Sequence, residues 1–222
     1  MNNTIKYTIA IILCLATPLL ADAQKTFLEG TIEYTATLQA VSSDGANMGT
    51  HSGKYIITIK GKQVKKEFRL DNNFDNTILI NGDGNTAYSL KSTQGKKYAI
   101  QLDLQELMAH DNAYAGFRIE DAGSSPAIAG LPVQKATVHY NDGSSVPILY
   151  TKDWKAEDEH LFEHFPSING LPLDFTYKTG NGALIHFRAE KVAPGVVENG
   201  AFRLPKDYKI ISTAEYQELS KK

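Results

Sequence analysis

The feature of this chain that most constrains its fold is an apolar residue at every second position. The clearest example is the segment 31–40, whose apolar side chains would all lie on one face of a strand: Ile32, Tyr34, Ala36, Leu38 and Ala40. The residues between them are threonine, glutamate and glutamine. A strand that alternates in this way has one dry face and one solvated face, so the pattern predicts antiparallel β-structure.

Similar runs recur along the chain, separated by residues that favour tight turns. They are Tyr55–Ile59, Val64–Leu70, Thr77–Ile80, Thr86–Leu90, Lys97–Leu102, Phe117–Glu120, Val133–His139, Val146–Tyr150, Leu173–Tyr177, Ala183–Lys191 and Ala201–Leu204. Turn signals such as Gly82-Asp83-Gly84 and Asn141-Asp142-Gly143 lie between them. Glycine, asparagine and aspartate tolerate the positive φ of hairpin turns, so we expect an antiparallel meander and no doubly wound parallel sheet.

Three segments have the pattern of short helices. Asp103 with Glu106, and Ser212 with Glu215, have the spacing of capping boxes. Lys155–Phe165 carries Leu161, Phe162 and Phe165 at helical spacing. A sheet of about a dozen strands must close, split into a sandwich or curl around something, and short helices with one apolar face would suit a curled sheet.

The N-terminus has the layout of a secretory signal peptide. A short region with Lys6 precedes the apolar run Tyr7–Leu20, and Ala21-Asp22-Ala23 follows. The run of about 14 residues is shorter than the roughly 20 that a spanning helix needs. We expect cleavage after Ala23 and a periplasmic or secreted protein, with an uncleaved N-terminal anchor as the alternative. We do not expect lipidation of Cys14, because Leu13 stands where a small residue is needed.

Composition bounds what the remaining residues, 24–222, can do. Cys14 is the only cysteine, so a chain cleaved after Ala23 has no disulfide and no thiolate. The formal net charge of −2 argues against nonspecific nucleic-acid binding, and 42% hydrophobic residues exclude a disordered chain. No linker-like stretch divides the segment, so one β domain over 24–222 is expected.

Two motifs could bind a metal ion, but each has a simpler interpretation. His160 and His164 are four residues apart and would share a helix face, yet Leu161 after His160 departs from the zinc motif HExxH. We therefore expect a solvated acidic face there. The segment 71–82 begins like a calcium loop but has Asn76 and Gly82 at the two most demanding positions, so we expect a hairpin turn and no metal site.

The sequence shows no signature of an enzyme. It has no GxSxG, no GxGxxG and no Walker loop. A pair of carboxylates cannot be recognised from sequence spacing alone, so a hydrolase stays an open third alternative. We expect a protein that is not an enzyme and carries no cofactor. The element Gly-Leu-Pro occurs at Gly130 and at Gly170, where we expect two strand starts rather than two ligand loops.

From Leu28 to Ser212 the order of features resembles the DUF4412 family of exported bacterial proteins. The segments that carry the resemblance are Ile128–Val133, Thr151–Trp154, Phe165–Phe175 and Phe202–Tyr208. Leu131 and Val133 depart from the family, which often has an aromatic residue and a cysteine there. The family is similar in shape to the lipoprotein carrier LolA. The resemblance implies a mainly β fold: a curved antiparallel half-barrel of about 10–12 strands with two or three short helices on the concave face.

The LolA-like shape implies an apolar cavity, so we expect a non-enzymatic envelope protein that binds a lipid, an acyl group or another apolar molecule. Aromatic and aliphatic residues of the strands are the candidates for its wall: Tyr34, Leu38, Phe68, Tyr98, Phe175 and Tyr177. Each of them could equally be ordinary core. The alternative is an interaction or sensor module of the envelope that binds a partner protein, a role that RseB-like relatives of this shape illustrate.

Overall fold

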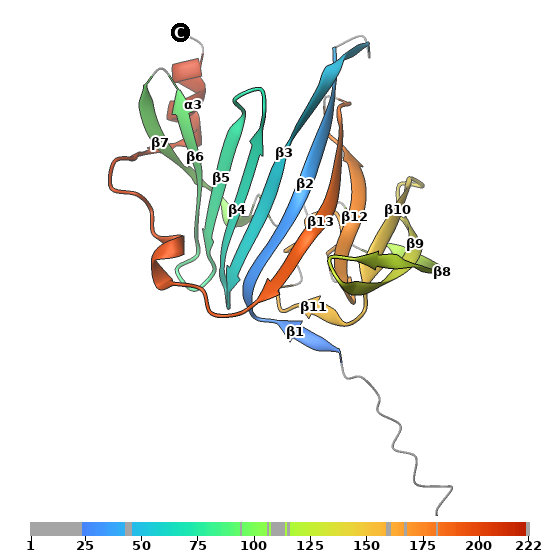
Figure 1. Cartoon of the computed structure of the whole chain (residues 1–222). Coiled ribbons are helices and arrows are strands. Elements are labelled where there is room, and N and C mark those ends of the chain that lie inside the picture. Colours follow the sequence, from blue (N-terminus) through green and yellow to red (C-terminus); the bar gives the residue numbers. More distant parts are fainter. Residues whose placement is uncertain are drawn as a thin grey trace, which may run out of the picture.

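The computed structural model describes residues 24–42, 46–93, 95–105, 107, 114, 116–158, 161–166, 168–180 and 182–220. The expected signal peptide, residues 1–23, lies outside this range. Within it the chain is mainly β (Figure 1). The strands are β1 (Lys25–Phe27), β2 (Glu29–Val41), β3 (Asn47–Lys60), β4 (Gln63–Leu70), β5 (Asp75–Asn81), β6 (Thr86–Thr93), β7 (Lys96–Leu102), β8 (Arg118–Ile128), β9 (Leu131–His139), β10 (Ser145–Thr151), β11 (Trp154–Ala156), β12 (Leu171–Lys178), β13 (Leu184–Pro194) and β14 (Lys209–Ser212).

Twelve of these strands form one sheet in the order β14-β7-β6-β5-β4-β3-β2-β13-β12-β10-β9-β8. Neighbours run antiparallel except β14 and β7, which are parallel. The sheet curves strongly and stays open, so that β8–β10 turn away from the plane of the central strands (Figure 1). The predicted fold class, a mainly β chain with a curved antiparallel sheet that does not close, is confirmed. A separate parallel pair, β1 and β11, lies below the sheet in this view.

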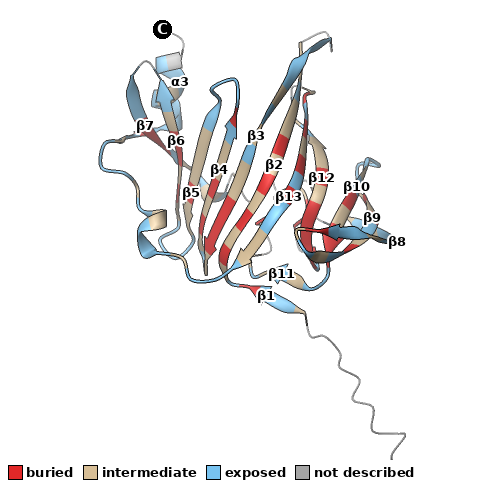
Figure 2. Ribbon diagram, viewed as in Figure 1, coloured by how far each residue is buried: buried red, intermediate tan, exposed pale blue. Residues whose placement is uncertain are grey.

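Most strands lie where the alternation predicts them, and the register shows why. Tyr34 of β2 pairs with Tyr55 of β3, which pairs with Phe68 of β4. On the other side, Ala36 pairs with Phe187 of β13, which pairs with Phe175 of β12. The apolar halves of successive strands therefore share one face, which we call the inner face. Bands of buried residues recur along β2, β4, β10 and β12 (Figure 2).

The segment between β11 and β12 corrects one prediction, because Lys155–Phe165 is not a helix. Trp154–Ala156 pairs with β1 as β11. The residues before Pro166 then form successive tight turns, in which Leu161 N–H donates to Asp158 O and Phe165 N–H to Phe162 O. Leu161 and Phe162 are adjacent and both buried. An α-helix points adjacent residues in different directions, so burial of both side chains on the inner face favours the irregular turns.

The two other predicted helices have different outcomes. α3 (Thr213–Ser220) is confirmed, and its capping box is formed: Glu215 N–H donates to Ser212 Oγ (3.2 Å) and Ser212 N–H donates to Glu215 Oε2 (2.7 Å). Near Asp103 the chain is helical at Leu104, Gln105 and Leu107, while Glu106 lies outside the described residues. α3 lies beside the edge strands and not on the inner face. Among the described residues, the inner face of the central strands is covered by residues 161–166 and 168, which we call the covering segment.

The C-terminal segment corrects a second prediction. Ala201–Leu204 is not a strand; it overlaps the short 3₁₀ helix η1 (Asn199–Phe202), in which Arg203 N–H donates to Gly200 O. Pro205 follows directly and cannot donate to a sheet ladder. Leu204 and Tyr208 pack on the outer face of β5–β7. The sequence analysis did not find the three short strands β1, β11 and β14.

Both Gly-Leu-Pro elements start strands, as expected. β9 begins at Leu131 and β12 at Leu171. Gly130 has a φ of +76°, which favours glycine, whereas a Cβ at Gly170 would lie 2.5 Å from Thr151 O. Glycine is therefore required at the two sites for different reasons. Residues 71–74 form the turn between β4 and β5, as expected for a hairpin, with Asn73 at a φ of 65°.

Candidate binding site

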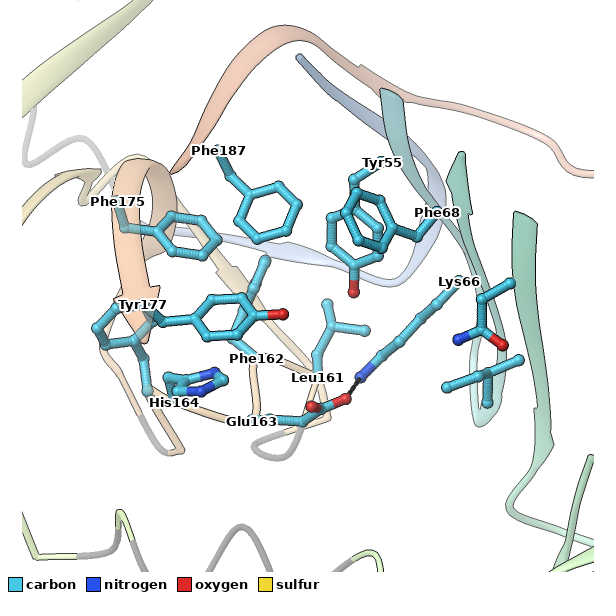
Figure 3. Close-up of a pocket in the computed structure, with 13 residues that line it drawn as sticks. Tyr55, Lys66, Phe68, Leu161, Phe162, Glu163, His164, Phe175, Tyr177 and Phe187 are labelled. Atoms are coloured by element: carbon cyan, nitrogen blue, oxygen red, sulfur yellow. Dashed lines mark hydrogen bonds and ion pairs between the residues drawn. The ribbon is translucent and has the colours of Figure 1, made fainter. Parts of the chain in front are cut away.

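A pocket of about 140 Å³ lies between the inner face of the sheet and residues 161–165 (Figure 3). Strands β3, β4, β5, β12 and β13 supply one wall, and the turns of residues 161–165 supply the other. The lining residues are Tyr55, Lys66, Phe68, Asn76, Ile78, Leu161, Phe162, Glu163, His164, Phe165, Phe175, Tyr177 and Phe187. The pocket is partly open, and beside it the Glu163 side chain is 41% exposed.

Phe187 is the centre of the aromatic wall. Its ring centroid lies 5.0 Å from that of Tyr55 and 5.3 Å from that of Phe175. Tyr177 stacks on it at 5.7 Å with an interplanar angle of 18°. These separations are those of favourable ring pairs. Cross-strand pairing fixes the rings, since Phe187 is directly opposite Phe175.

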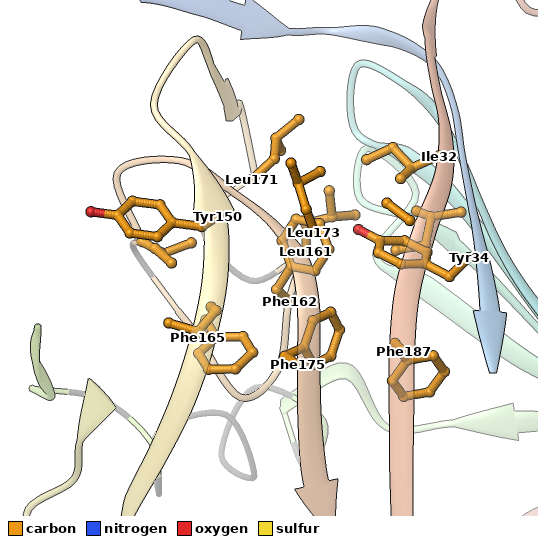
Figure 4. Close-up of a cluster of buried hydrophobic side chains, with 14 of the residues drawn as sticks. Ile32, Tyr34, Tyr150, Leu161, Phe162, Phe165, Leu171, Leu173, Phe175 and Phe187 are labelled. Carbon is orange, nitrogen blue, oxygen red and sulfur yellow. The ribbon is translucent and has the colours of Figure 1, made fainter. Parts of the chain in front are cut away.

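Residues 161–168 close the pocket because their own apolar side chains are anchored in the core. Leu161, Phe162, Phe165 and Ile168 are all buried (Figure 4). The Phe165 ring meets Phe175 edge-on at 5.3 Å. The His164 ring stacks on Tyr177 at 4.2 Å, and Tyr140 Oη donates to the His164 carbonyl oxygen (2.7 Å). The segment is thus held at several points although it has no regular secondary structure.

An ion pair joins the two walls of the pocket. Lys66 Nζ donates to Glu163 Oε1 at 2.8 Å. Only 6% of the Lys66 side chain is exposed, and its cross-strand neighbours are Ile57 and Ile78. An ammonium group on such an apolar surface requires a partner. Glu163 therefore both neutralises Lys66 and ties the covering segment to β4.

Two tyrosine hydroxyls point into the pocket towards this ion pair (Figure 3). Burial raises the pKa of Tyr177 to about 12, and the nearby Glu163 carboxylate adds to the rise. Burial likewise raises the pKa of Tyr55 well above its usual value, again with a contribution from Glu163. Both phenols therefore stay protonated at physiological pH and can donate hydrogen bonds.

The six candidate residues of the sequence analysis all lie on the inner face, but only some reach the pocket. Phe68, Phe175 and Tyr177 line it. Tyr34 is completely buried in the core, where its hydroxyl donates to Pro172 O (2.9 Å). Leu38 packs against the same core without lining the pocket, and Tyr98 belongs to a separate cluster with Ile100 and Ile211.

Sequence reasoning missed Lys66 as a pocket residue. A signal for Lys66 was present: it occupies the apolar register between Val64 and Phe68, where a charged side chain must find a partner. Nothing in the sequence pairs it with Glu163, which is 97 residues away. Tyr55 and Phe187 belong to the strand aromatics that the sequence predicts as wall residues of an incompletely filled half-barrel, and both line the pocket.

The metal motifs do not form a site in the described part of the chain. His160 lies outside it, and His164 packs its ring against Tyr177 and Tyr114. Asp71 accepts from Ser52 N–H through Oδ2 (3.1 Å) and pairs with His51. Among the described residues, no group of three or more His, Cys, Asp or Glu side chains is placed to hold a metal ion.

A second cavity, of about 350 Å³, lies on the other side of the covering segment. It is lined by residues of β1, β11 and the turns that follow: Thr26, Lys155, Ala156, Glu157, Asp158, Phe162, Phe165, Ile168 and Asn169. Phe162 and Phe165 line both cavities. These two rings are therefore shared between the two cavities.

Comparison with known proteins does not assign the chain to a family. No family model matches it, and no curated protein matches it. The resemblance to the DUF4412 family therefore stays a prediction. Among the residues described, no helix has the length and apolar character needed to cross a membrane.

Among solved structures the chain is similar to the crystal structure of MucB, with a TM-score of 0.39 and 12% identity over 87% of this chain and 64% of that chain. It is also similar to the crystal structure of MucB in complex with MucA(peri), with a TM-score of 0.39 and 13% identity over 83% of this chain and 57% of that chain. The chain thus spans less than two thirds of the length of both structures. TM-scores of this size do not establish a shared fold or function.

Proposed function

We propose that this protein is an exported, non-enzymatic binding module of the cell envelope that holds a partner polypeptide by one apolar side chain. The observation that supports the proposal is the pocket of about 140 Å³ between the aromatic wall and residues 161–165. A cavity of about 150 Å³ holds one benzene-sized group. One large side chain of a partner fits this volume.

The size of the pocket argues against a lipid as its occupant. Sites for drug-sized ligands have volumes of about 300–1,000 Å³, and an acyl chain with its head group needs at least as much space. The inner face has less room because Leu161, Phe162 and Phe165 already occupy it. The chain fills much of its own concavity, so the module is better suited to an anchor residue than to a carried lipid.

The chemistry of the lining also supports binding over catalysis. Lys66 and Glu163 pair with each other, so neither is poised as a free general base. Tyr55 and Tyr177 remain protonated near neutral pH. A wall of fixed rings with a few polar groups is typical of recognition sites.

Site-specific photo-crosslinking in cells that export the chain tests this proposal. A p-benzoylphenylalanine replacing Asn76 would lie in the pocket lining. The matched control replaces Thr77, the next residue of β5, whose side chain points to the outer face. We expect a protein adduct from position 76 that is absent from position 77, and its loss when Ile78→Phe narrows the pocket.

Adducts that are identical at positions 76 and 77, or that persist with Ile78→Phe, would contradict the proposal. The Ile78→Phe variant must keep the melting temperature of the parent chain, because otherwise a lost adduct would only report unfolding. Leu79→Phe is a suitable second control, since Leu79 lies on the same strand but packs on the outer face.

A lipid ligand remains the second candidate because of one observation, the wall that Phe162 and Phe165 form between the two cavities. Movement of these rings would join the spaces into a site of lipid size. Native mass spectrometry of protein purified under non-denaturing conditions tests this. Retained lipid in the parent chain, lost in Phe162→Trp, would favour the carrier role over the partner-binding role.

A further inference from the structure

We propose that the pocket recognises an uncharged phenol group, the chemistry of a tyrosine side chain presented by the partner. This inference rests on the proposed function and specifies which side chain the pocket takes. Three properties of the lining lead to it: the rings, two tyrosine hydroxyls without a hydrogen-bond partner in the described part of the chain, and the neutral ion pair.

The apolar part of the pocket fits a single aromatic ring. Along the wall, the ring centroid of Phe187 lies 5.8 Å from that of Phe68 and 5.3 Å from that of Phe175. Rings at such distances leave faces and edges with which another ring can pack edge-on or offset. The volume of about 140 Å³ is that of one ring with a small substituent.

The polar part of the pocket calls for a hydrogen-bonding atom on that ring. Neither the Tyr55 hydroxyl nor the Tyr177 hydroxyl forms a hydrogen bond with any residue that the structure describes, although both are desolvated. Three buried tyrosines elsewhere in the molecule are paired: Tyr34 with Pro172 O, Tyr140 with His164 O and Tyr150 with Asp121 Oδ1. A desolvated hydroxyl without a protein partner is uncommon and points to a ligand atom. A ligand hydroxyl can accept from one of these tyrosines and donate to the other.

The charge of the pocket selects against an ionised ligand. Among the described residues that line the pocket, Lys66 is the one lysine or arginine, and Glu163 already neutralises it at 2.8 Å. A carboxylate or ammonium would lose its hydration without gaining a free counter-charge. A phenol carries a hydroxyl without a charge and so avoids this cost.

NMR titration of the purified full chain with three small probes tests the inference. The probes are p-cresol, toluene and 4-methylbenzoate, which share a methylated ring and differ in its polar substituent. We expect p-cresol to bind about tenfold more tightly than toluene, since one hydrogen bond to a buried group has about that effect. We expect 4-methylbenzoate to bind most weakly. Shifts should map to the ring protons of Phe187 and Tyr177.

Single-hydroxyl variants localise the effect. Tyr55→Phe and Tyr177→Phe keep the ring and should each reduce p-cresol affinity severalfold while leaving toluene affinity unchanged. Tyr150→Phe is the control, because the Tyr150 hydroxyl donates to Asp121 outside the pocket. Equal loss in all three variants would overturn the assignment to the two pocket tyrosines.

The remaining outcomes separate this inference from the proposed function. Toluene binding as tightly as p-cresol, or 4-methylbenzoate binding most tightly, would overturn the phenol assignment and leave the pocket as a general apolar site. If none of the three probes binds at millimolar concentration, both the phenol assignment and the proposed binding function would be overturned. A short peptide, acetyl-Gly-Tyr-Gly-amide, should bind like p-cresol and better than its Phe counterpart. If p-cresol binds but the peptide does not, the ligand of the pocket would be a free phenol and not a tyrosine side chain of a partner.

Discussion

The central and the edge strands of the large sheet have the same alternating sequence pattern but bury it in different ways. On β2–β4, β12 and β13 the inner face joins one continuous core that includes Tyr34, Ile57, Leu173 and Phe187. On β5–β7 and β14 six of the buried residues form two clusters of three, Leu79 with Leu90 and Ala99, and Tyr98 with Ile100 and Ile211. The first cluster lies on the outer face and the second on the inner face.

The difference comes from what covers each region. Residues 161–168 place four buried apolar side chains against the central strands. The edge strands are covered by the C-terminal segment, whose Leu204, Tyr208 and Tyr216 are only partly buried. The same covering segment forms one wall of the pocket. Stability and the candidate site therefore depend on the same residues in the centre, whereas the edge region contributes only Asn76 and Ile78 of β5 to the pocket.

The largest expected effect is a core truncation in the centre. Leu173 is completely buried, so Leu173→Ala should lower the free energy of unfolding by about 2–5 kcal/mol. Leu79→Ala, in the small edge cluster, should cost about 2 kcal/mol or less because fewer atoms lose contacts. Chemical denaturation of both variants measures the contrast. Equal losses would show that the two regions do not differ in packing.

Gly170→Ala tests the anchor of β12, beside the covering segment. The added Cβ would lie 2.5 Å from Thr151 O and 2.6 Å from Tyr150 Cδ2, so β10 and β12 must move apart. We expect a loss of about 1–3 kcal/mol in the free energy of unfolding. Gly180→Ala is the matched control, because nothing lies within 4 Å of its Cβ position. If Gly170→Ala were as stable as Gly180→Ala, the close approach of residue 170 to β10 would be refuted.

The ion pair across the pocket should show a smaller, asymmetric effect. Glu163→Ala leaves the Lys66 ammonium on an apolar surface, and we expect a loss of about 1–2 kcal/mol. Lys66→Met keeps the aliphatic stem and should be nearly neutral. In a double-mutant cycle the second change should restore most of the stability lost in Glu163→Ala. If the losses of stability in the two single variants simply added up in the double variant, the ion pair would not hold the covering segment.

The smallest expected effect is a pH-dependent loosening of the C-terminal segment. Glu29 accepts from Val197 N–H (2.7 Å) and pairs with Lys60, and both contacts lower the pKa of Glu29. A lowered carboxyl pKa in the folded state stabilises the fold above the usual value of 4.5. That stability is lost as the pH falls through the lower, folded pKa. The protection factor of the amides near Val197, which corrects the exchange rate for the intrinsic effect of pH, should therefore fall below pH 4.5, and Glu29→Gln should abolish this pH dependence.

The sequence was sufficient to predict what depends on neighbouring residues. Alternation predicted most strands and the common face of Tyr34, Phe68 and Phe175, because a period of two fixes the face once the strand exists. The capping box at Ser212 and Glu215 predicted α3, because its hydrogen bonds are local. The inner-face location of the candidate residues follows from the same local rule.

What could not be predicted depends on contacts between distant residues. β1, β11 and β14 are short strands that exist through pairing with partners far along the chain. The apolar spacing of Leu161, Phe162 and Phe165 suits a helix, yet burial of adjacent side chains against β12 and β13 favours turns. The pocket itself arises where Glu163 meets Lys66, and sequence spacing does not reveal such a meeting. In the covering segment, burial against the sheet therefore outweighed the local helical pattern and produced turns.

The central claim is that residues 161–166 fill the inner face of the sheet and form one wall of the small pocket. Nuclear Overhauser measurements between aromatic protons test it directly. If the claim holds, cross-peaks connect the Phe165 ring to the Phe175 ring, 5.3 Å between centroids, and the His164 ring to the Tyr177 ring, 4.2 Å between centroids. Absence of both, with random-coil shifts for residues 161–166, would show an open concavity and contradict the claim.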